Sequence, residues 1–410
     1  MDLTSVVPDR VSTPAKLFLF GMILNGLGNG IFNVVLQLYL TSLGFESATL
    51  GTISMMSAVS ATLLTIPAGV LADRYGKGKV VLSGFAVGAL AFVLMLAESS
   101  VEAFMIGFLL IGVTNSTGVV MVPLYSSFFD DDEMDRAFGL MGFLSIIASS
   151  VGSLIGFIPP MLVARYGLSI QFSYYIVLAV AVVFLLGGMP FVLLSIRGVV
   201  EPERREGFSF NLRSKDVVAK FCLIKVISRI GYGVFFSLFP YYVNTKFGIQ
   251  SDALGTLYFA SNFVTAGANI IAPRISKRLG TLKTIALAFA VCAPFYMMIP
   301  LAPNFAWLSV LYVIRIGLVN VSSPLTSSLL MRLLHEDEKA TATGITSMAT
   351  NGGNAVGPWL GGRLMEQVSL GFPAYLGAGL YAASGAAYYL LLRNVNEPSR
   401  TDLIEAPHQP

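Results

Sequence analysis

Three basic side chains lie inside long apolar stretches, where a charge is costly and is therefore a candidate for function. Arg229 and Arg315 each lie near the middle of such a stretch, and Lys225 precedes Arg229 by one helical turn on the same face. A guanidinium group binds a carboxylate or a phosphate through two parallel hydrogen bonds. No Asp or Glu lies deep in these stretches, so the pattern favours an anionic ligand for the arginines. Two alternatives remain open: backbone carbonyls and Asn side chains hold each arginine, and Lys225 extends its ammonium group to the polar end of its helix.

Four amide side chains recur at every fourth residue of the first apolar stretch and make a polar stripe on one helix. They are Asn25, Asn29, Asn33 and Gln37. A stripe of amides facing lipid would be costly, so it faces the protein interior or a water-filled cavity. We predict that these amides bind a solute together with Arg229, Arg315 and Lys225, with Asn29, Asn33 and Arg229 as the first choices.

The elements that position these residues are membrane-spanning helices. Of the 410 residues, 55% are hydrophobic and 12% are charged, and the mean hydropathy is +0.74. A soluble globular chain has about 25% charged residues, so most of this exterior is expected to face lipid. The sequence has twelve apolar runs, two of them interrupted by internal basic residues. The length of each run is close to the ~20 residues with which a helix crosses a bilayer. The sequence therefore predicts an all-α integral membrane protein with twelve transmembrane helices.

Lys and Arg residues are concentrated in alternate loops, and such residues favour the cytoplasmic side of a membrane. If the N-terminus is cytoplasmic, the outside segments hold only Arg165, Lys246 and Arg363. We therefore expect a multi-pass protein of the cell (plasma) membrane with both termini in the cytoplasm. The expected organisation has a six-helix bundle at residues 1–196 and a second one at residues 217–394. A cytoplasmic linker at 197–216 joins them, and a cytoplasmic tail follows at 395–410.

The two halves of the chain repeat one another. With an offset of 204 residues, TSLGFESATLGTIS at 41–54 aligns with TKFGIQSDALGTLY at 245–258, and ADRYGKGK at 72–79 aligns with SKRLGTLK at 276–283. Both copies begin on the same side of the membrane, because each half has an even number of helices. The prediction is two pseudo-symmetric six-helix bundles related by an axis along the membrane normal.

The segment AGVLADRYGKGK at 68–79 concentrates charge in an otherwise apolar chain. Gly76 and Gly78 are expected to allow a tight turn between two helices, and the bases hold that turn in the cytoplasm. The segment resembles the signature of the loop between helices 2 and 3 in the major facilitator superfamily. The residues that carry the resemblance are Gly69, Leu71, Asp73, Arg74, Gly76, Lys77 and Lys79. The twelve helices, the central loop and the parallel halves extend the resemblance over nearly the whole chain.

The resemblance implies the fold of that superfamily and transport by alternating access of two bundles. It also implies that Asp73 helps to latch the bundles together in the outward-facing state. For Arg74, Lys77 and Lys79 the alternative is that they only anchor the loop in the cytoplasm. The second copy has Lys277 in place of the acid, so an acid-based latch is expected on one side only.

Small residues recur in the eleventh predicted helix. Their spacing is similar to a pattern that superfamily drug exporters carry in helix 5. The residues are Gly353, Gly357, Pro358 and Gly361. Small side chains let two helices approach closely, and a proline permits a bend. We predict that these residues serve helix packing.

The favoured function is secondary transport of a small organic anion, with protons or a counter-transported anion left open as coupling partners. One alternative is a proton-coupled exporter of multiple drugs or other lipophilic compounds, although no deep acid is present to carry the proton. Another is a non-transporting membrane receptor on the same fold. The sequence has no nucleophile–base set, metal-ligand spacing or phosphate-binding loop, so we expect no enzyme, no cofactor and no metal. The bases are too scattered to bind nucleic acid.

Overall fold

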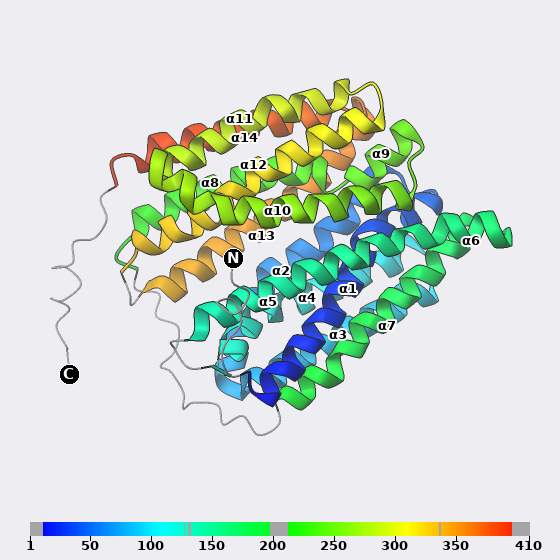
Figure 1. The fold of residues 1–410 in the computed structure, drawn as a ribbon, viewed down its shortest axis with the longest axis horizontal. Helices are drawn as coiled ribbons and strands as arrows, with labels where there is room; N and C mark the ends of the chain where they lie inside the picture. Colours follow the sequence, from blue (N-terminus) through cyan, green and yellow to red (C-terminus); the bar gives the residue numbers. More distant parts are fainter. Residues whose placement is uncertain (1–10, 127, 130–132, 197–211, 336–337, 396–410) are drawn as a thin grey trace.

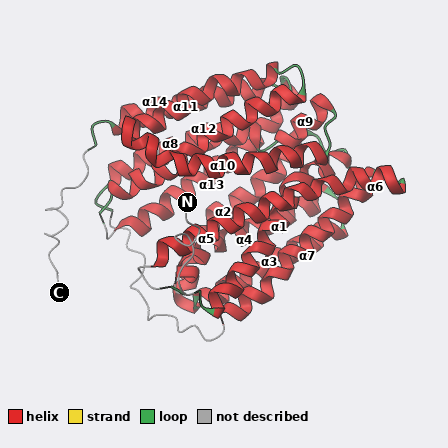
Figure 2. Cartoon of the chain, viewed as in Figure 1, coloured by secondary structure: helices red, strands yellow, loops and turns green. Residues whose placement is uncertain are grey.

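The first half of the chain forms six helical rods. The structure is a computed structural model that describes residues 11–126, 128–129, 133–196, 212–335 and 338–395, and these residues form helices and no strand (Figure 2). The helices of the first half are α1 (Thr13–Ser42), α2 (Ser47–Tyr75), α3 (Lys77–Ala97), α4 (Val101–Ser126), α5 (Met134–Leu154), α6 (Ile158–Tyr166) and α7 (Ile170–Ile196). A single 3-10 turn at Ile155–Phe157 joins α5 to α6.

The second half also forms six rods. Its helices are α8 (Lys215–Phe236), α9 (Phe239–Phe247), α10 (Ser251–Leu279), α11 (Thr281–Met298), α12 (Phe305–Arg332), α13 (Lys339–Gln367) and α14 (Phe372–Leu392). Only two residues separate α8 from α9, and a 3-10 turn at Ile299–Leu301 follows α11. The expected linker lies largely at 197–211 and the expected tail at 396–410, both outside the described residues.

Nine helical segments of the described chain are long and apolar enough to cross a membrane. They cover the six rods of the first half, together with α8–α9, α11 and α12. The other rods, α10, α13 and α14, have 29, 29 and 21 residues, so each is long enough to cross, although less apolar. The all-α membrane fold is therefore confirmed, and the twelve rods correspond to the twelve predicted helices.

Prolines mark the points where three rods are broken. Pro159, Pro240 and Pro300 each lie in the first turn of a new helical segment. A proline has no N–H to donate and is tolerated in that turn, whereas inside a helix it removes a hydrogen bond. The apolar runs alone did not predict these breaks.

Helices of one half pack mainly on each other, as Figure 1 shows by colour. In the first half α1 packs on α7 and α5, and α2 on α4; in the second, α8 packs on α13 and α14, and α10 on α12. The two halves meet where α2 lies along α13 and where α10 lies along α5. The surfaces between these two contacts enclose the candidate site.

Hydrogen bonds join the two halves at one end of the molecule. The Ser47 hydroxyl donates to the Gly362 carbonyl over 2.9 Å, and the Ser251 hydroxyl donates to the Gly156 carbonyl over 2.6 Å. Ser47 is the first residue of α2 and Ser251 is the first residue of α10, while Gly362 lies in the last turns of α13 and Gly156 in the 3-10 turn after α5. We call this end of the molecule the bonded end. The opposite end, which has the α2–α3 and α10–α11 turns, is called the far end.

At the far end, Glu338 ties the start of α8 to the start of α13. Its carboxylate accepts hydrogen bonds from the backbone N–H groups of Arg213, Ser214 and His335 and from the Ser214 hydroxyl. Burial alone would raise the pKa of the Glu338 carboxyl, but these hydrogen bonds to its charged form outweigh burial and lower the pKa. The carboxylate therefore holds the beginning of the second half in place.

Candidate functional site

Tyr232 lines three adjoining cavities, of which two are lined by residues of both halves and one by residues of the second half alone. The neutral chamber, about 410 Å³, is lined from α1, α2, α4, α5, α8, α9, α10 and α12. The basic chamber, about 420 Å³, lies within the second half and includes Lys225, Arg229 and Arg315. A third cavity of about 490 Å³ lies between α2 and α13 and shares Arg229 with the basic chamber. These volumes fall in the usual range for small-molecule sites, roughly 300–1,000 Å³.

Every charged side chain that lines these three cavities is basic. Lys225, Arg229 and Arg315 line the basic chamber, Arg229 also lines the third cavity, and the neutral chamber has no charged lining residue. The structure thus brings together the three bases that the sequence analysis selected. The described residues contain no group of three or more His, Cys, Asp or Glu side chains that could hold a metal ion.

Arg229 is exposed and has no hydrogen bond or ion pair with any residue that the structure describes. Its position depends on Gly353 of α13, because a Cβ atom there would lie 2.7 Å from the Arg229 Cβ. The small residue lets α13 pack closely on α8 while the guanidinium reaches the cavities. An unpaired guanidinium in this position is free to bind an anion.

Arg315 is held differently, since only 1% of its surface is exposed. Its Nη2 donates to the Tyr381 hydroxyl over 2.6 Å, and its Cζ lies 3.6 Å from the centre of the Phe236 ring. The rings of Tyr232, Tyr296 and Tyr381 lie 5.2–5.6 Å from the same atom. Aromatic faces attract a cation, so this cage takes the place of a carboxylate. The Arg315 Nε has no hydrogen-bond partner among the described residues.

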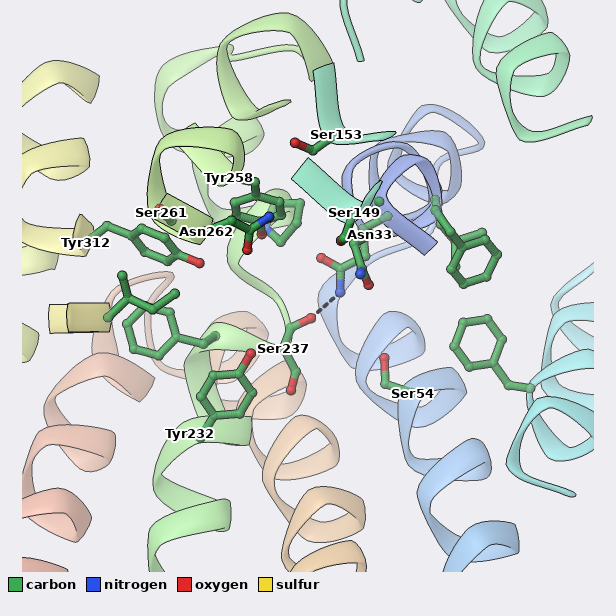
Figure 3. A pocket seen from close by; sticks show the side chains of 18 residues that line it. Asn33, Ser54, Ser149, Ser153, Tyr232, Ser237, Tyr258, Ser261, Asn262 and Tyr312 are labelled. Carbon is green, nitrogen blue, oxygen red and sulfur yellow. Dashed lines mark hydrogen bonds between the residues drawn. The ribbon is translucent and has the colours of Figure 1, made fainter. Parts of the chain in front are cut away.

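The neutral chamber is lined by hydroxyl, amide and aromatic groups (Figure 3). Asn33 is exposed toward it from α1, and Tyr258, Ser261 and Asn262 line it from α10. The Gln37 Nε2 donates to the Ser237 carbonyl, while the Gln37 Oε1 is buried without a partner in the described chain. The chamber can therefore hydrogen-bond a neutral ligand but offers it no charge.

The amide stripe of α1 divides into two parts. Asn33 and Gln37 line the neutral chamber. Asn29 instead donates to Asn25, to its side-chain oxygen over 2.7 Å and to its backbone oxygen over 3.0 Å, and neither residue lines the three cavities. A pair of amides one turn apart satisfies itself, so the structure gives Asn25 and Asn29 no contact with these cavities.

The charged motif lies at the far end. Gly76 forms the α2–α3 turn with a φ of 98°, a conformation that favours glycine. Gly78 does not form the turn as expected; it lies in α3, where it packs against Ile196 of α7. Asp73, Arg74 and Lys79 are exposed, Lys77 is half-buried, and Gly69 has open space around it. The Asp73 carboxylate has no hydrogen bond or ion pair in the described part of the chain.

The small residues of α13 form two contact faces. Gly353, Gly357 and Gly361 lie against α8, with a Cβ at 361 falling 1.9 Å from the Val234 carbonyl oxygen. Pro358 lies close to both Gly233 of α8 and Gly51 of α2. Helix α13 therefore packs tightly on α8 of its own half with one face and on α2 of the first half with another face.

Sequence reasoning missed most of the cavity lining. Tyr232, Tyr381 and the serines Ser54, Ser149 and Ser261 are cavity residues that no motif or periodicity selected. Serine is common in packed membrane helices whether or not it lines a cavity. Only the arrangement of the helices in space identifies those that line the site.

Comparison with known proteins places this chain in a family. The family model described as Major Facilitator Superfamily matches residues 18–220 and again residues 221–410. The chain is 24% identical over 405 residues to the class G tetracycline resistance protein of Vibrio anguillarum, covering 92% of each chain. It is 22% identical over 379 residues to multidrug resistance protein 1 of Bacillus subtilis, covering 90% of this chain and 93% of that protein.

Solved structures resemble the chain over almost its full length. The nucleoside transporter NupG has a TM-score of 0.70 at 14% identity, covering 93% of this chain and 100% of its own. A bacterial homologue of the human lysosomal transporter Spinster, inward-facing and occupied, has a TM-score of 0.71 at 14% identity, covering 94% and 98%. At such identity the likeness shows the fold alone. The family model, which matches both halves, shows that the protein belongs to the major facilitator superfamily.

Proposed function

We propose that this transporter carries a small organic anion, which binds in the three cavities that Tyr232 lines. The observation that carries the proposal is that the charged side chains lining those cavities are all basic. A charge within the membrane-spanning part of a protein is costly when no counter-ion lies near it. A bound carboxylate or phosphate would supply the missing negative charge.

The three bases would contribute unequally. Arg229 is exposed and unpaired in the described chain, so it would contact the anion directly. Lys225, one turn away and also lining the basic chamber, would add a second positive charge. Arg315 would act mainly by long-range electrostatic attraction of the anion, because its aromatic cage covers most of its surface.

The proposal is tested by anion binding and uptake in the Arg229→Ala variant. A hydrogen bond to a charged group contributes about 1.5–3 kcal/mol, so affinity for a carboxylate should fall about tenfold or more. Arg229→Lys should lose less, since it keeps the charge but not the two parallel hydrogen bonds. Affinity would be measured by calorimetry in detergent, and uptake in proteoliposomes.

Arg165→Ala provides the matched control. Arg165 is exposed at the end of α6 and lines none of the three cavities. Its removal should leave affinity unchanged. Equal affinities for an anion in wild type, Arg229→Ala and Arg165→Ala, with all three proteins folded, would refute the anion proposal.

A second candidate function is export of lipophilic drugs. It is favoured by the resistance proteins among the relatives and by the aromatic lining of the neutral chamber, which includes Phe32, Phe108, Phe236, Tyr258 and Tyr312. Aromatic faces bind lipophilic cations. Under this alternative a lipophilic cation would bind and Arg229→Ala would not weaken its binding.

The orientation and the division into two bundles belong to the same proposal. The excess of Lys and Arg at the far end supports a cytoplasmic location for that end and for both termini. The cell membrane is the proposed location, and residues 1–196 and 217–394 are the proposed moving bundles. Accessibility of single cysteines introduced beside Lys79 and beside Arg165, labelled from either side of the membrane, would test the orientation.

A further inference from the structure

We propose that the transported solute has two parts: an anionic group in the basic chamber and a neutral, polyhydroxylated body in the neutral chamber. The anionic part rests on the proposed function. The neutral part rests on the separate lining of the neutral chamber. The two chambers meet at Tyr232 and Ile316, which line both.

The neutral chamber is polar without being charged. Its polar lining residues are Asn33, Gln37, Ser54, Ser149, Ser153, Tyr232, Ser237, Tyr258, Ser261, Asn262 and Tyr312. A chamber for a purely apolar body would leave these groups without partners, which is unfavourable. A chamber for a second charge would be expected to contain an opposite charge. The lining therefore fits a body that is neutral and makes many hydrogen bonds.

Several groups of the lining are free to accept hydrogen bonds. The hydroxyls of Ser54, Ser153 and Ser261 donate to carbonyls at positions 50, 150 and 257, so their oxygens remain available to accept. The buried Gln37 Oε1 is an acceptor without a partner among the described residues. Hydroxyl groups of a ligand can donate to these acceptors.

Two amides can both donate to and accept from such a body. Asn33 of α1 and Asn262 of α10 have no hydrogen bond with any described residue, and both line the chamber. They come from opposite halves of the protein. A solute bound by both would contact both moving bundles, as a transported solute must.

The test compares gluconate with hexanoate. The two anions have the same number of carbons and one carboxylate each, and they differ in the hydroxyl groups on the chain. In wild-type protein we expect gluconate to bind about tenfold more tightly or better, which corresponds to one or two net hydrogen bonds. Arg229→Ala should weaken both anions, since both share the carboxylate.

Asn262→Leu tests the neutral chamber directly, and Asn269→Leu is its control. Both residues are on α10, two turns apart, but Asn269 lines none of the three cavities. Asn262→Leu should reduce the preference for gluconate and leave hexanoate binding nearly unchanged, whereas Asn269→Leu should keep the preference. Asn33→Leu serves the same purpose if Asn262→Leu does not fold.

The outcomes separate the two proposals. If both anions bind equally and both depend on Arg229, the anion carrier stands and the two-part solute is wrong. If the affinity for both anions is the same in wild type and Arg229→Ala, the proposed function is wrong. If neither anion binds, both proposals are wrong.

Discussion

At the scale of single residues, the main problem is how Arg315 keeps a charge in an apolar interior. The guanidinium faces four aromatic rings and donates one hydrogen bond to Tyr381. A desolvated cation over an aromatic face gains about 2 kcal/mol or more. The rings come from α8, α11 and α14, while the arginine comes from α12. The cage therefore links four helices of the second half through one side chain.

Tyr381→Phe should destabilise the protein measurably. The change removes the acceptor of the Arg315 Nη2 and leaves a buried donor unsatisfied, which costs about 1–3 kcal/mol. Thermal unfolding in detergent should show a lower Tm than that of wild type. Tyr389→Phe is the control, because Tyr389 is on the same helix and is 39% exposed. Equal Tm values for the two variants would show that the hydroxyl does not support Arg315.

The sequence could predict the position of the charges but not their surroundings. Arg229 and Arg315 were recognisable because a charge in an apolar run is rare. Phe236, Tyr296 and Tyr381 are ordinary aromatic residues in ordinary apolar runs, and only the packing of α8, α11 and α14 brings them to one point. The amide stripe shows the same limit, since periodicity does not distinguish Asn33 in the cavity from Asn29 paired with Asn25.

At the scale of helices, the internal repeat accounts for the contact between the two halves. Ser47 and Gly51 of α2 align with Ser251 and Gly255 of α10 at the offset of 204 residues. Each serine donates to a carbonyl of the opposite half. Each glycine faces a backbone carbonyl oxygen of the opposite half, Pro358 or Ser153, at 2.3 Å from where a Cβ would lie. The bonded end is thus built twice from the same four-residue spacing.

Gly51→Ala and Gly255→Ala should each open the bonded end. The added Cβ meets a backbone atom, which cannot move away as a flexible side chain would, so the two helices must separate. The expected result is a longer distance between spin labels placed on opposite halves at this end. Gly267→Ala is the control, because that glycine on α10 has open space around it.

An unchanged distance in both glycine variants would mean that the bonded end tolerates the extra methyl group.

The repeat itself could be predicted from the sequence. The helices could be predicted too, because apolar runs of this length leave few alternatives. The contacts that the repeated residues make between the two halves could not be predicted from the sequence. Small residues permit close approach on any face, and the sequence does not say which helix will use that face.

At the scale of the whole molecule, the hydrogen bonds from Ser47 to Gly362 and from Ser251 to Gly156 join the two halves at the bonded end. The far end has an exposed Asp73 with no partner among the described residues. Alternating access requires the reverse arrangement at some stage, with the bonded end apart and the far end together. A carboxylate at the end of α2 can then meet the positive N-terminus of a helix in the other half. The unpaired state of Asp73 in this conformation is what such a latch requires.

Asp73→Asn should therefore slow turnover without weakening solute binding. Asp73 lines none of the three cavities, so the affinity of the conformation seen here should be unchanged. Loss of an interaction worth about 1.4 kcal/mol in the other conformation would change the ratio of the two conformations tenfold. Uptake in proteoliposomes should show a lower kcat, while Kd from calorimetry stays near the wild-type value. Glu98→Gln, at an exposed acid after α3, should change neither. A weaker Kd with normal turnover in Asp73→Asn would exclude the latch and make Asp73 part of solute binding.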